Sequence, residues 1–235
     1  MSSSAGLQGE GDECDGLARP VPAAPRMTTE PASVSAGLHW TALPPMPQPH
    51  SAQMRSEACC GAATVMIIIG ICVGGTHIFS SGLDGTAAQG IFHLVVGAEA
   101  AVALLCLLGL MMGDPGTLRR SEARCTPIPA GAIRDSLLQG KPVPQGLGNV
   151  HDADRGTFCV RCLLWREREE KHVHHCSICQ RCVRDFDHHC GVFGRCIAGQ
   201  GLHGNMGYFK VVIAMGCCGA FTTMGAFVAV VAQAF

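Results

Sequence analysis

The chain has 235 residues, of which 48% are hydrophobic and 15% are charged, and its formal net charge is −1. This composition lies outside the usual range of soluble globular domains and favours a membrane protein. A disulfide framework is also disfavoured, because seven of the 15 cysteines are crowded between residues 159 and 196. Their spacing is typical of zinc ligands, which favours a reducing compartment.

Residues 1–57 are rich in Ser, Ala, Gly and Pro and show neither a helical nor a strand period. Such a segment buries too little apolar surface to offset its chain entropy. It also lacks the basic start and short apolar core of a cleavable signal peptide. The sequence therefore predicts a disordered cytoplasmic N-terminal tail.

Three apolar runs are long enough to cross about 30 Å of hydrocarbon as helices. We expect transmembrane helices at 58–79, 90–112 and 211–234. The loop from Ser80 to Gln89 holds no Lys or Arg, whereas 14 of the 17 basic residues lie between 113 and 210. The positive-inside rule therefore places the basic segment in the cytoplasm.

The basic segment divides into a linker at 113–156 and a Cys-rich domain at 157–209. The linker begins with Asp114-Pro115-Gly116 and is expected to be irregular, apart from a short helix near residues 130–138. The predicted fold is an α-helical integral membrane protein. Its transmembrane helix bundle has three spans and carries a cytoplasmic, zinc-stapled Cys-rich domain.

The Cys-rich domain has the ligand spacing of a zinc protein. A gap of two residues lets both thiolates of a Cys-x2-Cys pair reach one ion at about 2.3 Å. Two closed sites need eight ligands, which either seven Cys and one His or six Cys and two His would supply; the second choice leaves one thiol free. Cys190 is the obvious candidate for that thiol, because it follows Asp187-His188-His189, which has the ingredients of a thiol-activating triad. The candidate ligands are Cys159, Cys162, His175, Cys176, Cys179, Cys182, His189, Cys190 and Cys196.

These motifs resemble the DHHC protein S-acyltransferases, or palmitoyltransferases. The resemblance covers the Asp114-Pro115-Gly116 tripeptide, the Cys-rich domain and the flanking spans. It implies two structural zinc ions, each held by three Cys and one His. The first ion would be bound by Cys159, Cys162, His175 and Cys182, and the second by Cys176, Cys179, His189 and Cys196.

The resemblance also implies an activity. Cys190 would take a long-chain fatty acyl group, such as palmitoyl, from acyl-CoA and pass it to cysteine thiols of target proteins. His188 would act as its base, and Asp187 would orient His188. The expected partners are acyl-CoA, cysteine-containing protein substrates and the lipid bilayer, with a homo-oligomer as a further expectation and no nucleic acid. The expected location is an endomembrane, the Golgi or the endoplasmic reticulum.

The chain departs from the family pattern at several positions. The stretch before His175 is longer than usual, and Glu170 and His172 stand where the family has Pro and Arg. After the nucleophile, residues 191–195 read Gly-Val-Phe-Gly-Arg instead of the family's Pro-Trp and Asn residues.

Further departures follow the last cysteine. Asn205 and Phe209 match a family Asn and Phe only if extra residues within 198–204 are looped out. The family normally has a fourth span and a cytoplasmic tail, whereas this sequence stops at Phe235. We therefore expect a divergent member that is truncated or reduced after its third span.

Several alternatives stay open from the residues. Glu99, near the middle of the second expected span, is a protonated structural acid, the partner of a polar group in the bundle or part of the acyl-CoA path. Cys190 is alternatively a zinc ligand in place of a His. The whole chain is alternatively a catalytically silent zinc adaptor. A membrane-anchored RING-like ubiquitin ligase is disfavoured, because a RING ends in a second paired Cys-x2-Cys.

Overall fold

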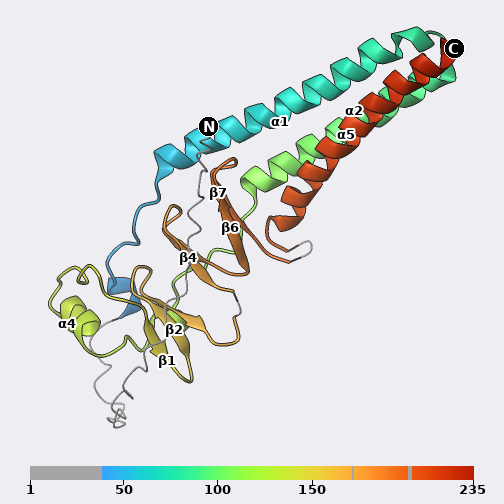
Figure 1. Ribbon diagram of the computed structural model, residues 1–235. Helices are drawn as coiled ribbons and strands as arrows, with labels where there is room; N and C mark the ends of the chain where they lie inside the picture. The colour runs from blue at the N-terminus through green and yellow to red at the C-terminus, as the bar shows by residue number, and fades with distance from the viewer. Residues whose placement is uncertain (1–38, 171, 201–202) are drawn as a thin grey trace, which may run out of the picture. The chain divides into compact units, whose positions relative to one another are not determined.

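A computed structural model describes residues 39–170, 172–200 and 203–235, which belong to one compact unit (Figure 1). The part of the expected tail up to residue 38 lies outside the described residues. The helices are η1 (Trp40–Ala42, 3-10), α1 (Ser51–Ser80), η2 (Ser81–Leu83, 3-10), α2 (Ala87–Met112), α3 (Glu122–Cys125), α4 (Ala132–Leu138) and α5 (Met206–Gln233). The strands are β1 (Val150–Asp152), β2 (Gly156–Cys159), β3 (Leu164–Glu167), β4 (His174–Cys176), β5 (Arg181–Val183), β6 (Phe186–Cys190) and β7 (Arg195–Ala198).

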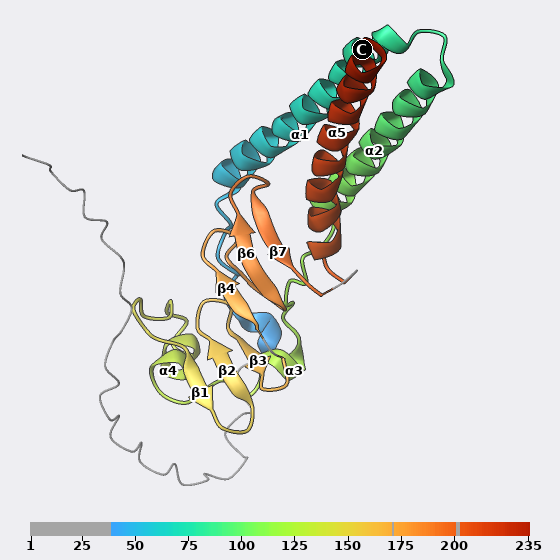
Figure 2. The same cartoon turned by 45° about the vertical axis from the view of Figure 1, so that its right-hand side comes forward.

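Within the described chain, α1, α2 and α5 are long and apolar enough to cross a membrane. They run side by side, with α2 antiparallel to the other two (Figure 2). Glycines allow α5 to approach α1 and η2 closely, since a Cβ on Gly75 in α1 would lie 2.9 Å from Thr223 and one on Gly82 in η2 would lie 2.7 Å from Val230. Many large apolar side chains of these helices are exposed, as a lipid-facing bundle requires.

Helix α1 begins at Ser51, within the segment expected to be a disordered tail, and not at residue 58. Its 30 residues correspond to about 45 Å of helix, which exceeds the hydrocarbon thickness of about 30 Å. The additional turns carry Arg55 and Glu57. A hydropathy pattern shows only the apolar part of such a helix. The start predicted from the sequence, residue 58, therefore lies after the observed one.

Residues 39–50 also differ from the expected tail, because they pack along the Cys-rich domain. Leu43 is buried in the core of that domain. The carbonyl oxygen of Pro47 accepts a hydrogen bond from Arg181 at 2.6 Å, and the His50 N–H donates to the carbonyl of Ile178 at 3.0 Å. The apolar side chains of this segment have few partners within the segment, but the Cys-rich domain supplies a core against which they pack.

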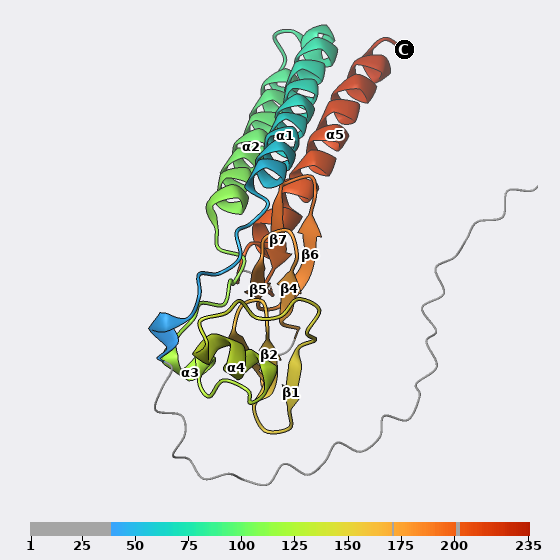
Figure 3. The same cartoon turned by 90° about the vertical axis from the view of Figure 1, so that its left-hand side faces the viewer.

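The Cys-rich domain consists of three small antiparallel sheets (Figure 3). The first has the order β1-β2-β3, and hairpins β4-β5 and β6-β7 follow. Four residues join β2 to β3, β4 to β5, and β6 to β7, and in each case the fourth has a positive φ: 54° at Leu163, 52° at Gln180 and 62° at Gly194. Three successive hairpins therefore share one turn geometry. The predicted helical membrane protein with a Cys-rich domain is confirmed.

The Asp114-Pro115-Gly116 tripeptide connects α2 to the Cys-rich domain. The Asp114 carboxylate accepts hydrogen bonds from the N–H groups of Gly116 and Thr117, at 3.0 and 2.9 Å. Gly116 adopts a φ of 98°, which a glycine tolerates better than other residues. Thr117 then pairs with Val183, beside the candidate ligand Cys182. The tripeptide thus turns the chain so that it runs along the edge of β5.

Candidate metal centres and active site

The first four-ligand cluster comprises Cys159, Cys162, His175 and Cys182, whose ligand atoms lie within 4.8 Å of one another. Antiparallel pairing of β4 and β5 sets His175 directly opposite Cys182. The turn between β2 and β3 contributes the other two thiols. Nδ1 of His175 lies 3.6, 3.2 and 3.9 Å from the sulfurs of Cys159, Cys162 and Cys182.

The second cluster repeats this arrangement one hairpin later, with Cys176, Cys179, His189 and Cys196. His189 lies opposite Cys196 in the β6-β7 hairpin, and the β4-β5 turn contributes the other two thiols. Nδ1 of His189 lies 3.5, 3.4 and 3.9 Å from the sulfurs of Cys176, Cys179 and Cys196. The structure thus brings together the two sets of four that the family resemblance implied.

The donor chemistry of both clusters fits zinc. Three thiols and one imidazole nitrogen converge on one point, as in a closed structural zinc site. Hydrogen bonds from Cys162 and Cys182 hold the pKa of Cys159 far below its usual range, and the hydrogen bond with Cys159 raises the pKa of Cys162. A dication would stabilise all three as thiolates. Two Cys3His sites therefore fit two zinc ions.

Cys190 belongs to neither cluster, although its backbone repeats that of a ligand cysteine. The N–H of Gly194 donates to the carbonyl of Cys190 at 2.8 Å, as Leu163 does to Cys159 at 2.7 Å. Phe193 occupies the position of the second cysteine in this third turn. The turn therefore has the backbone of a zinc knuckle but holds a single thiol, which explains why Cys190 remains unliganded.

Asp187 and His188 form a hydrogen-bonded pair next to Cys190. Nδ1 of His188 lies 2.7 Å from Oδ2 of Asp187. Side chains alternate along a strand, so His188 and Cys190 share one face of β6 and His189 points to the other. An irregularity in the register between Phe186 and His188 interrupts this alternation at Asp187, and such bulges redirect side chains. The pairing leaves Nε2 of His188 available.

Residues 152–235 match the family model of the DHHC palmitoyltransferase domain. The chain carries a DHHC palmitoyltransferase domain. The matched residues include α5 as well as the Cys-rich domain, and the name DHHC domain is used below for the Cys-rich domain alone. The predicted resemblance is thereby confirmed, and the family is one of acyltransferases. No curated protein matches the chain in a sequence comparison.

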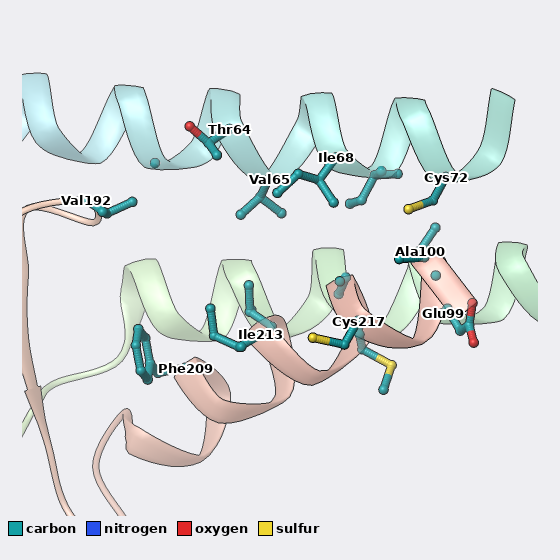
Figure 4. A pocket seen from close by; sticks show the side chains of 18 of the residues that line it. Thr64, Val65, Ile68, Cys72, Glu99, Ala100, Val192, Phe209, Ile213 and Cys217 are labelled. Carbon is teal, nitrogen blue, oxygen red and sulfur yellow. The ribbon is translucent and has the colours of Figure 1, made fainter. Parts of the chain in front are cut away.

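An apolar cavity of about 510 Å³ extends from the DHHC domain into the helix bundle (Figure 4). Cys190 and Phe193 line it on the side of the domain, and all three long helices contribute apolar side chains. Val192 and Phe209 lie at one end in Figure 4, whereas Cys72 and Glu99 lie at the other. Cys190 is only 8% exposed, so its surroundings are largely protein and cavity.

Glu99 lies at the deep end of this cavity. The hydroxyl of Thr222 on α5 donates to its carboxylate, with both oxygens at 3.0 Å. Of the three roles open from the sequence, the structure shows one, since Glu99 is the partner of a polar group in the bundle.

The divergent residues 191–195 pack against the ends of two helices. A Cβ on Gly194 would lie 2.0 Å from the carbonyl oxygen of Met54 in α1. The guanidinium of Arg195 donates to the carbonyls of Met111 and Gly113 at the end of α2, where helix carbonyls lack partners within the helix. The family's usual residues are thus replaced by ones that fit closely between α1 and α2.

Asn205 and Phe209 connect the DHHC domain to α5. Asn205 is fully buried; its side-chain oxygen accepts from the Ala198 N–H at 2.9 Å, and its amide donates to the Cys196 carbonyl at 2.8 Å. Phe209 packs edge-on against both His188 and Phe193. Asn205 thus bonds to the segment of Cys196, and Phe209 lies beside His188. Asn205 therefore fixes the chain just after a metal ligand.

Glu57 was not among the residues predicted from the sequence. Its Oε2 lies 3.3 Å from Nε2 of the candidate ligand His189. A hydrogen bond from Gln53 at 2.8 Å contributes most to holding the pKa of Glu57 below its usual range. The only sequence signal was an isolated acid immediately before an apolar run, which indicates no metal site by itself.

Proposed function

We propose that the chain is a protein S-acyltransferase that moves a long-chain fatty acyl group from acyl-CoA to cysteine thiols of membrane-associated proteins. The observation that carries this proposal is the position of Cys190, which is excluded from both metal clusters and lines an apolar cavity. A nucleophilic thiol needs an adjacent base, and a fatty chain needs apolar surroundings.

The length of the cavity, as well as its apolar lining, favours a fatty acyl substrate. The cavity runs along α1 from Gly61 to Val73, which corresponds to about 18 Å of helix. A carbon–carbon bond of about 1.5 Å advances an extended chain by about 1.25 Å, so this length holds about 14 carbons. The cavity is therefore suited to a chain of the myristoyl or palmitoyl class whose thioester lies at Cys190.

The first step would form an acyl-enzyme. His188 accepts the proton of Cys190, and Asp187 stabilises the resulting imidazolium through its hydrogen bond to Nδ1. The Cys190 sulfur attacks the thioester carbonyl, the bond from that carbonyl to the CoA sulfur breaks, and CoA leaves with the proton from His188. In the second step a substrate thiol gives its proton to His188 and attacks the acyl carbonyl, the bond from that carbonyl to the Cys190 sulfur breaks, and Cys190 takes the proton from His188. Each step replaces one thioester with another. Because CoA leaves before the substrate thiol reacts, the kinetics should be ping-pong.

The metal ions would be structural. Each cluster supplies four protein ligands, which leaves no open position for a substrate or water. Zinc bound there holds the three hairpins together. It would therefore fix His188 and Cys190, because His189, the residue between them on β6, is one of its ligands.

We also propose an orientation. The DHHC domain lies in the cytoplasm of an endomembrane, the Golgi or the endoplasmic reticulum, because free thiols persist in a reducing compartment. The segment at 113–210 that contains it holds 14 of the 17 Lys and Arg residues, as the positive-inside rule expects for a cytoplasmic segment.

The decisive experiment compares purified wild-type protein with Cys190→Ser after incubation with clickable palmitoyl-CoA. We expect hydroxylamine-sensitive labelling of the wild type, with one CoA released per acyl group, and none at residue 190 of the variant. Cys59 and Cys60 are exposed on α1, so a Cys59→Ser/Cys60→Ser variant serves as the matched control and should keep its label. Equal labelling of wild type and Cys190→Ser would favour a silent zinc adaptor instead.

A further inference from the structure

The two metal clusters differ in what surrounds their histidines. Nε2 of His189 lies 3.3 Å from the carboxylate of Glu57, and the two side chains are only 9% and 20% exposed. Nε2 of His175 is also buried but has no hydrogen-bond partner among the described residues. The second cluster therefore has an outer carboxylate that the first lacks.

The geometry gives this contact a defined direction. Nδ1 of His189 faces the three sulfurs of its cluster, so a bound metal takes the lone pair of Nδ1 and leaves the proton on Nε2. That N–H then donates to Oε2 of Glu57. A carboxylate in this position fixes the ring orientation and raises the basicity of the ligand.

The carboxylate is itself held in place. Oε1 of Glu57 accepts a hydrogen bond from Gln53, one turn earlier in α1, at 2.8 Å. It would lie 3.9 Å from a Cβ on Gly191, the residue after Cys190. Farther along the helix, a Cβ on Gly61 would lie 2.3 Å from the carbonyl oxygen of Val192. The first turns of α1 thus dock closely on both the ligand His189 and the loop that follows the nucleophile.

We propose that Glu57 is a positioning residue of the second metal centre. It anchors His189 from α1 and thereby holds the strand that carries Cys190 against the transmembrane bundle. Its effect on the metal is independent of any activity, whereas its effect on Cys190 rests on the proposed function. A shift of the first turns of α1 would accordingly move His189, which is adjacent to Cys190.

The test uses the full chain in detergent micelles, loaded with cadmium for NMR or with zinc for release to a colorimetric chelator. Glu57→Ala should move one of the two cadmium resonances and leave the other in place. Zinc release from that centre should become about 10- to 100-fold faster. Glu57→Gln, whose amide oxygen still accepts a hydrogen bond, should have a cadmium resonance and a zinc-release rate close to those of the wild type. Arg55→Gln, on the same turns of α1, serves as the control and should match the wild type.

An activity measurement then separates this proposal from the proposed function. Glu57→Ala should slow formation of the Cys190 acyl-enzyme without raising the half-saturating concentration of palmitoyl-CoA, and Glu57→Gln should partly restore the rate. Unchanged resonances and zinc release in Glu57→Ala would overturn the inference, whether or not the protein is active. A selective cadmium shift in a protein that forms no acyl-enzyme would uphold the inference and contradict the proposed function.

Discussion

Glu170 accepts two hydrogen bonds from Arg124, at 2.8 and 2.7 Å, although 46 residues separate them in the chain. Arg184 approaches the same carboxylate at 2.6 Å. Glu170 belongs to the stretch that is longer than usual before His175. This stretch therefore links the DHHC domain to the linker at 113–156 through an ion pair.

Replacing Glu170 with Gln should lower the stability of the DHHC domain by about 1–3 kcal/mol, because hydrogen bonds to charged groups are lost. The hydrogen bonds from Arg124 contribute most to lowering the pKa of Glu170, to about 2 from 4.5. The carboxylate's contribution is therefore complete above about pH 4.5 and is lost as the pH falls from there towards 2. Thermal unfolding in micelles at a series of pH values should show the gap between wild type and Glu170→Gln narrowing in that window. The exposed neighbour Glu169, changed to Gln, should leave stability unaltered.

Gly194→Ala should destabilise the DHHC domain by more than about 1 kcal/mol. Its φ is 62°, which disfavours any residue with a Cβ, and the added atom would meet the Met54 carbonyl. Gly191→Ala is the matched control, since a Cβ there would meet nothing closer than 3.9 Å. Unfolding temperature and acyl-enzyme formation should both fall for Gly194→Ala alone. Similar losses in both variants would show that α1 is not docked on this loop.

Loss of a ligand should lower the metal content, whereas loss of the nucleophile should leave it unchanged. Cys176→Ala removes one of four ligands, so the second zinc should be lost and the DHHC domain should unfold. Cys190→Ser should keep two zinc ions per chain and wild-type stability. Elemental analysis of the purified proteins measures both. A zinc deficit in Cys190→Ser would mean that this sulfur is a ligand.

Glu99→Leu should shift the acyl-chain preference towards longer chains. The substitution replaces a carboxylate at the deep end of the cavity with an apolar side chain, so a chain that reaches this depth no longer meets a polar group. Competition between myristoyl-, palmitoyl- and stearoyl-CoA for acyl-enzyme formation, resolved by mass spectrometry, gives the profile. Glu122→Gln, on the short helix α3 outside the bundle, should leave the profile unchanged. A proportional loss with every chain length would assign Glu99 to bundle stability instead.

Much of the metal-binding arrangement was predictable from the sequence, because chelation constrains spacing. A Cys-x2-Cys pair can close on one ion only within a tight turn, so the spacing predicted the kind of site. The assignment of each ligand to one of the two ions came from the family resemblance, because the ligand count alone left two sets open. The three apolar spans were predictable for a similar reason, since a long run with almost no charge is typical of a helix that crosses hydrocarbon.

Contacts between distant segments were not predictable. The order of residues 39–50 depends on apolar surface that the DHHC domain supplies, and no local pattern in those residues indicates it. Glu57 is recognisable only once α1 is known to extend beyond the hydrocarbon and dock beside His189. The fit of Gly194 against Met54 likewise requires the position of a helix more than a hundred residues earlier in the chain.

The alternation along β6 has a consequence for how this segment can change over evolutionary time. His189 faces the metal site on one side of the strand, and His188 and Cys190, the pair of the proposed proton transfer, share the other side. Deleting one residue between the bulge and Cys190 would present each histidine to the wrong side. Substitutions of His188 or Cys190 should impair proton transfer and leave metal binding intact, whereas an insertion or deletion of a single codon should abolish both together.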